Sequence, residues 1–208
     1  PYISTRTDFN GHEDTELETG GDVSFRLTPS VVTSWTINPD FAQVEADADT
    51  IELRDTERFL PEKRLFFREG EDLFASGRNQ LYYSRRLTDI DAGGRVSGEL
   101  NDYRFAMIDV YGDAVHTGDS YYGNSSIFRL LRNVGEKSNV GLHASTSDLK
   151  EGHSRVLGSD GKLFLNDDWS FNYQVAGADD QLETGVDEPV KDRSDYLGYG
   201  SVVYEKYP

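Results

Sequence analysis

The 208-residue sequence contains no cysteine, few basic residues and no long apolar run. Without cysteine the chain has no disulfide, no thiolate metal ligand and no cysteine nucleophile. No stretch approaches the roughly 20 apolar residues that a transmembrane helix requires. Lysine and arginine number 21 against 38 acidic residues, which gives a formal net charge of -17 at pH 7. That balance opposes binding to nucleic acid and to anionic membrane surfaces, because phosphates would be repelled.

The sequence starts at Pro1 and shows no signal peptide, so we expect a processed chain or an excised part of a longer one. Its length suits one large domain or two small ones. Hydrophobic residues make up only 36%, which together with high charge is typical of disorder. Aromatic residues at 12%, and a regular alternation of apolar and polar positions, instead favour a folded β-protein.

The alternation first appears in a predicted hairpin. Val23, Phe25 and Leu27 alternate with polar neighbours, a turn follows at 28–30, and residues 31–37 alternate again. The same rhythm predicts further strand pairs over 95–112 and 125–147, and single strands over 2–9, 81–87, 169–176 and 196–207.

Connections between the predicted strands differ in length. Short turns, among them Gly93-Gly94 and the glycine-flanked residues 158–161, alternate with long acidic loops at 113–124, 148–161 and 177–194. This asymmetry, with strands of about ten residues bracketed by tyrosines, is typical of a transmembrane β-barrel. A soluble β-sandwich or open sheet shows the same alternation. The pattern alone leaves both architectures open.

Residues 38–80 break the alternation with a dense mixture of charges and aromatic rings. Stretches 42–48 and 56–59 could each hold a helical turn. Because charged groups in a packed environment need partners, we expect this segment to lie against a wall of the protein.

Several blocks in and around this segment follow one another in a distinctive order. They are DVSFRLTP at 22–29, TINPDFAQVEAD at 36–47, FLPEKR at 59–64 with FFREG at 66–70 and DLF at 72–74, and YSRR at 83–86. Over residues 22–86 the chain resembles the domain-of-unknown-function 5916 family. It departs from the family pattern at Leu65, where a second proline is usual, and at 51–54, where the family is more apolar.

The resemblance implies a bacterial outer-membrane location, because members of that family are predicted outer-membrane β-barrels. They often follow an N-terminal module that resembles family 9 carbohydrate-binding domains, which implies an association with glycans. We therefore predict an all-β antiparallel meander that forms a partial or complete outer-membrane-type β-barrel with an irregular internal segment. Residues 1–208 are expected to form a single barrel-type domain, a fragment of a longer barrel, with 38–80 as a plug or rim segment.

The predicted function is binding or passage of a solute, with a glycan as one candidate. One alternative is a soluble β-domain that binds carbohydrate or protein. Another is a glycoside hydrolase that uses paired carboxylates such as Glu45 and Glu62. A protein that is not an enzyme and needs no cofactor is favoured. Expected partners are outer-membrane lipid and a glycan or small solute, without nucleic acid, and the oligomeric state stays open.

The candidate site is a charged network in the barrel lumen, since a polar lumen tolerates charges that a lipid-facing surface does not. A simpler alternative is a set of structural ion pairs that anchor a loop. The predicted members are Glu45, Asp47, Glu62, Lys63, Arg64, Glu69, Arg85 and Arg86. Tyr121 and Tyr122, expected in a loop, are candidate sugar contacts. No metal site is predicted, because the four histidines do not have the spacing of metal ligands.

Overall fold

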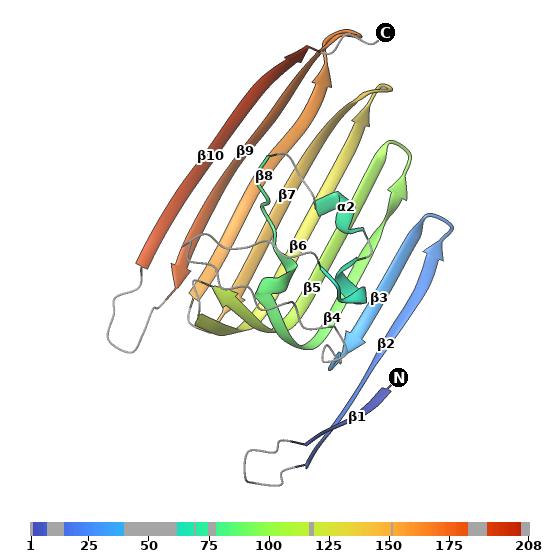
Figure 1. Cartoon of the computed structure of the whole chain (residues 1–208), viewed down its shortest axis with the longest axis vertical. Coiled ribbons are helices and arrows are strands. Elements are labelled where there is room, and N and C mark those ends of the chain that lie inside the picture. Colours follow the sequence, from blue (N-terminus) through green and yellow to red (C-terminus); the bar gives the residue numbers. More distant parts are fainter. Residues whose placement is uncertain are drawn as a thin grey trace.

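A computed structural model of the chain describes residues 2–7, 15–39, 62–68, 70–74, 78–116, 119–150, 152–182 and 191–204. It contains one antiparallel sheet of ten strands, in which each strand lies beside its neighbours in the sequence (Figure 1). The strands are β1 (Tyr2–Thr7), β2 (Thr15–Thr28), β3 (Val31–Ile37), β4 (Leu87–Leu100), β5 (Tyr103–His116), β6 (Asp119–Val134), β7 (Ser138–Leu149), β8 (Gly152–Phe164), β9 (Trp169–Leu182) and β10 (Lys191–Tyr204). Between β3 and β4 lie the short helices α1 (Leu65–Arg68), α2 (Glu71–Phe74) and the 3-10 turn η1 (Ser84–Arg86).

The predicted all-β antiparallel meander is therefore confirmed. Strands β1 and β10 are the two edges of the sheet, and no pairing joins them in the described ranges. The sheet is open, as in a partial barrel. In the part of the chain that the structure describes, no helix is long and apolar enough to cross a membrane.

Several connections were predicted wrongly. Gly93-Gly94 lies within β4 and residues 158–161 lie within β8, so neither is a turn. Glycine is used there for close approach: a Cβ on Gly158 would lie 2.7 Å from a methyl carbon of Leu81. The long loops were also overestimated, because the strands continue into polar sequence on both sides of 117–118, 151 and 183–190. Residues 81–87 are mostly irregular and include η1 rather than forming a strand.

Successive hairpins are staggered by a constant amount. Val31, where β3 starts, pairs with Gly98, two residues before β4 ends. Tyr103, where β5 starts, pairs with Arg132, two residues before β6 ends. A shift of two residues per hairpin is one residue per strand. With a rise of about 3.3 Å and a strand spacing of about 4.8 Å, this corresponds to a strand tilt of about 35°. Barrel walls have tilts of roughly 35–45°.

The described part of the irregular segment, residues 62–68, 70–74 and 78–86, lies across one face of the sheet, here called the inner face (Figure 1). Phe67, Leu73 and Phe74 of this segment are 2–6% exposed and pack with inward side chains of β4 to β7. Each such side chain contributes about 1.5–3 kcal/mol when fully buried. The inward partners in this core are Leu87, Ile90, Ala106, Ile108, Val110, Ala114, Tyr121, Ile127 and Leu149.

The opposite face, here called the outer face, carries apolar side chains that are left exposed. Strand alternation brings them to one side, since their register partners on neighbouring strands share that side. They include Val23, Phe25, Trp35, Ile37, Leu100, Tyr103, Met107, Tyr111, Leu142, Leu157, Trp169, Val175, Tyr196, Val202 and Tyr204, all at least 38% exposed. The sheet is thus apolar on the uncovered side and mixed polar and apolar on the side that the segment covers.

Candidate functional site

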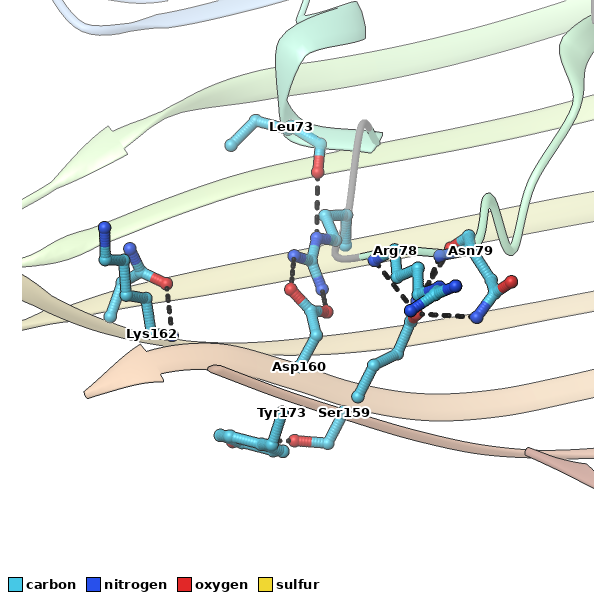
Figure 2. Close-up of polar contacts among 10 residues, drawn as sticks. Leu73, Arg78, Asn79, Ser159, Asp160, Lys162 and Tyr173 are labelled. Atoms are coloured by element: carbon cyan, nitrogen blue, oxygen red, sulfur yellow. Dashed lines mark hydrogen bonds and ion pairs between the residues drawn. The ribbon is translucent and has the colours of Figure 1, made fainter. Parts of the chain in front are cut away.

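A buried ion pair joins the segment to the middle of the inner face (Figure 2). Arg129 on β6 donates from Nη1 and Nη2 to the two carboxylate oxygens of Asp160 on β8, at 2.6 and 2.8 Å. Its Nε donates to the carbonyl oxygen of Leu73 in α2 at 2.8 Å. The side chains of Arg129 and Asp160 are 2% and 7% exposed. One guanidinium therefore connects two strands and the segment that covers them.

The ion pair crosses the intervening strand β7 at Gly141. This residue pairs with Asp160 on one side and with Leu131 on the other. A Cβ placed on Gly141 would lie 2.5 Å from both terminal nitrogens of Arg129. Glycine at this position leaves the space through which the guanidinium reaches the second strand.

A second connection holds the segment further along, at Gln174 on β9. Its Oε1 accepts hydrogen bonds from the backbone N–H groups of Arg78 and Asn79, at 3.2 and 2.8 Å. Its Nε2 donates to the backbone carbonyl of Asn79 at 2.7 Å. The Gln174 side chain is fully buried, so this one amide replaces the water that two backbone amides and a carbonyl would otherwise bind.

The third connection is a compact ion pair near the start of the segment. Arg64 donates from Nε and Nη2 to the carboxylate of Glu62 at 2.9 and 2.8 Å. It also donates to the backbone carbonyls of Ser84 and Leu87. Burial raises the pKa of Glu62, but hydrogen bonds from Arg64 and Ser84 and the charge of Arg64 outweigh burial and lower it overall. The carboxylate is thereby held in its ionised form.

A polar groove of about 510 Å³ lies beside the Arg129–Asp160 pair, between the segment and the inner face of β6 to β10. Its lining combines apolar surface with charged, amide and hydroxyl side chains, which include Asp72, Arg78, Asn139, Lys162, Asn172 and Ser201. Figure 2 shows Arg78, Asp160 and Lys162 together in this region. Its volume suits a small solute, since ligand pockets commonly measure about 300–1,000 Å³.

The predicted charged network is only partly visible. Glu45, Asp47 and Glu69 lie outside the described residues. Glu62 and Arg64 do pair, as described above. Lys63 is half-buried, and its backbone N–H donates to Glu62 Oε1 at 3.0 Å. Arg85 and Arg86 lie in η1, half-buried and exposed respectively. Glu62 and Arg64 form their ion pair within the segment, and the Arg64 bond to the Leu87 carbonyl joins the segment to β4. The lumen network and the anchoring role both stay predictions.

The two candidate sugar-contact tyrosines do not lie in a loop, because both belong to β6. Tyr121 points inward and is 5% exposed, packed in the core, which leaves no open ring face for a sugar. Tyr122 points to the outer face, donates to the Asp91 carboxylate and packs edge-on against Tyr111, 4.9 Å between ring centroids. Their opposite orientations follow from strand alternation, which the loop prediction had ignored.

Sequence reasoning missed Arg129, Asp160 and Gln174, whose side chains hold the segment on the inner face. It also missed Gly141, which leaves the space that the Arg129 guanidinium occupies. A signal was present for Arg129, because alternation puts it on the same face as Ile127 and Leu131. His143 is a further buried group: it is fully buried, and neither ring nitrogen has a hydrogen-bond partner among the described residues. No cluster of metal-ligating side chains occurs among the described residues.

A sheared antiparallel meander, with a mixed polar and apolar inner face under an irregular segment, defines an all-β protein with an open sheet, as in a partial barrel. Residues 1–103 match the family described as Domain of unknown function (DUF5916), and the chain belongs to that family. The match includes the irregular segment and the first four strands, so the predicted family resemblance is confirmed. No curated protein and no solved structure gives a significant match to the chain.

Proposed function

We propose that this chain forms part of the wall of a bacterial outer-membrane β-barrel whose inner face binds or passes a solute. The observation that carries the proposal is the exposed apolar outer face. Soluble proteins rarely expose contiguous apolar patches larger than a few hundred Å², whereas lipid-facing strands carry apolar side chains outward at every second position.

Tyrosines on the outer face support a bilayer of ordinary thickness. Tyr103 and Tyr111 lie eight residues apart on β5, and Tyr196 and Tyr204 lie eight residues apart on β10. Eight residues span about 26 Å of strand, or about 21 Å along the membrane normal at a tilt of about 35°. Aromatic girdles flank an apolar band about 25 Å tall in outer-membrane barrels.

The apolar band on the outer face is also displaced along each successive strand, by the amount that the strand tilt predicts. Ile37, at the end of the apolar run on β3, is aligned through successive register partners with Gln181 on β9. The apolar run on β9 ends at Val175, six residues before Gln181. A slip of six residues over six strand steps is again one residue per strand. The apolar band therefore lies at a constant height although the strands are tilted, as is expected for a surface in contact with a bilayer.

Inside the wall, the segment 62–86 would act as a constriction and the polar groove as the solute site. Buried ion pairs hold the segment in place, and the groove beside it offers amides, hydroxyls and charged groups. Polar constrictions of this kind select or orient solutes in barrel lumens. The link to glycans rests on relatives of the family.

The two tryptophans provide the test. The sequence contains only Trp35 and Trp169, and both lie on the outer face, 54% and 43% exposed. Trp169 starts β9, beside the Tyr204 ring at 4.8 Å between centroids, whereas Trp35 lies four residues into β3. Four residues are about 11 Å along the membrane normal at this tilt. Trp169 is therefore expected near one interface and Trp35 near the bilayer midplane.

The experiment measures tryptophan fluorescence in vesicles of lipids brominated at different depths of the acyl chain, with Trp35→Phe and Trp169→Phe to isolate each signal. Trp35 should be quenched best by deep bromines and Trp169 by shallow ones, and aqueous iodide should quench neither strongly. A soluble β-domain, the rival function, would leave both tryptophans indifferent to brominated lipid. That result would refute the membrane proposal.

A further inference from the structure

The floor of the groove is a continuous row of polar side chains across four strands. Asn139 on β7 pairs with Lys162 on β8, and Lys162 pairs with Asn172 on β9. Asn172 in turn pairs with Ser201 on β10. All four line the groove. Two amides and a hydroxyl therefore accompany one ammonium group in a straight line, which suits a ligand with several hydroxyls and a negative charge.

The charge balance of the groove is opposite to that of the whole chain. Asp160 is neutralised by Arg129, and Asp72 is paired with Arg104 at 2.5 Å. Arg78 and Lys162 take part in no ion pair within the described ranges. The guanidinium of Arg78 lies 5.1 Å from the Tyr199 ring centroid, and the Lys162 ammonium lies 4.8 Å from that of Phe164. Two cations without an acidic partner in the described ranges therefore line the groove, in a protein with a net charge of -17.

The backbone that carries these cations is well anchored. Arg78 is held to β9 by its own N–H bond to Gln174, and the Lys162 N–H donates to Asn139 Oδ1 at 3.3 Å. Figure 2 shows them on either side of the Asp160 carboxylate. A ligand would therefore order only the two side chains and not the backbone at Arg78 and Lys162, which reduces the entropy cost of binding.

We propose that this groove binds an anionic solute rich in hydroxyl groups, such as an acidic sugar. Its carboxylate would be attracted by Lys162 and Arg78, and its hydroxyls would bond to Asn139, Asn172 and Ser201. The inference rests on the proposed function, because it assigns a solute class to the inner face of the same wall. Both aspartates of the groove already have partners, so they offer little to a cationic solute.

The test is calorimetric titration of the detergent-solubilised protein with sodium glucuronate, glucose and sodium acetate. Glucose has the hydroxyls without the charge, and acetate has the charge without the hydroxyls. Glucuronate should bind at least about tenfold more tightly than either, because only glucuronate combines the negative charge with the hydroxyl groups. Equal affinity for glucuronate and either reference compound, or no glucuronate binding, would overturn the proposal.

Variants locate the site. Lys162→Gln and Arg78→Gln keep the polar chain and remove the charge, and each should weaken glucuronate binding about tenfold while leaving glucose unaffected. Lys137→Gln is the matched control, because Lys137 pairs with Asp167 at 2.9 Å in a turn outside the groove. Unchanged glucuronate binding in Lys162→Gln, with an unchanged unfolding midpoint, would sink the assignment.

The outcomes of the binding experiment and of the membrane test are independent of each other. If brominated lipids quench the tryptophans but glucuronate does not bind, the barrel wall stands and the solute class is wrong. If glucuronate binds through Lys162 but lipid does not quench, the groove stands and the membrane location is wrong.

Discussion

Removing the carboxylate of Asp160 should destabilise the protein strongly, because Asp160 is the partner of a buried guanidinium. In Asp160→Asn, the buried Arg129 guanidinium, 2% exposed in the parent, loses the one acidic partner that it has among the described residues. The asparagine amide oxygen can accept a hydrogen bond from the guanidinium, but it carries no negative charge and replaces two carboxylate acceptors. Leaving one partner of a buried ion pair unmatched costs about 3–5 kcal/mol.

The double variant Arg129→Met/Asp160→Leu separates this cost from ordinary packing. It removes both charges, so neither is left buried and unpaired, and such replacements are often close to neutral. Arg129 also donates to the Leu73 carbonyl. That carbonyl loses its partner in the double variant, which costs about 1–3 kcal/mol. The double variant should therefore be more stable than Asp160→Asn, although it carries one more substitution.

Urea unfolding in detergent, followed by tryptophan fluorescence, gives the free energies from the midpoint and slope. Asp167→Asn serves as the control, because Asp167 pairs with Lys137 but is 93% exposed, and exposed pairs contribute little. Its midpoint should not move. An Asp160→Asn variant as stable as the parent, or a double variant less stable than Asp160→Asn, would show that the pair does not hold the segment to the sheet.

Four further outcomes are expected. Glu62→Gln should abolish an acid-dependent loss of stability. Because the folded pKa of Glu62 is lowered, the contribution of its carboxylate to stability is complete above about pH 5 and disappears as the pH falls through that lowered value. Urea midpoints are measured against pH for the parent and the variant, and two parallel curves would show that the pair is unimportant. Gly141→Ala should cost about 1–3 kcal/mol by overpacking, since its Cβ would meet Arg129; an unchanged midpoint contradicts this. Gln174→Ala should speed hydrogen exchange at the backbone amides of Arg78 and Asn79, which Gln174 binds. Unaltered protection would show that Gln174 does not hold the segment there. His143→Leu should stabilise by about 1 kcal/mol, because it removes two buried ring nitrogens without partners; a lower urea midpoint would imply an unseen partner.

The fold was predictable from the sequence wherever alternation met an apolar outer face. Val23, Phe25 and Leu27 revealed the hairpin of β2 and β3. Period-two alternation is a local signal, so it needs no knowledge of distant partners. The overall meander followed from the same signal repeated along the chain.

Polar parts of strands were less predictable, because their composition is that of loops. Tyr121 and Tyr122 stand in sequence rich in aspartate, glycine and asparagine, yet the strand continues through them. Beyond an apolar band, strands need no apolar side chains, and alternation between two polar environments leaves no hydropathy signal. The acidic composition therefore hid the strand ends at 113–124 and 177–182.

The candidate site was not predicted because polar strands were interpreted as loops, which gave the wrong strand register. In a meander each tight turn sets the pairing of its two strands, so two correct turns determine which residues become neighbours across three strands. The turn that includes Lys150 and the turn at 165–168 align Asn139 with Lys162 and then with Asn172. Reading 148–161 as a loop removed the first turn and with it β8, which carries both Asp160 and Lys162. No pattern local to either residue could compensate, because Arg129 and Asp160 are 31 positions apart and meet only when β7 is correctly aligned between them. The alternation of outward apolar side chains therefore predicts the sheet from the sequence. The inner face is not predictable in this way, because its chemistry depends on residues that only the strand register brings together.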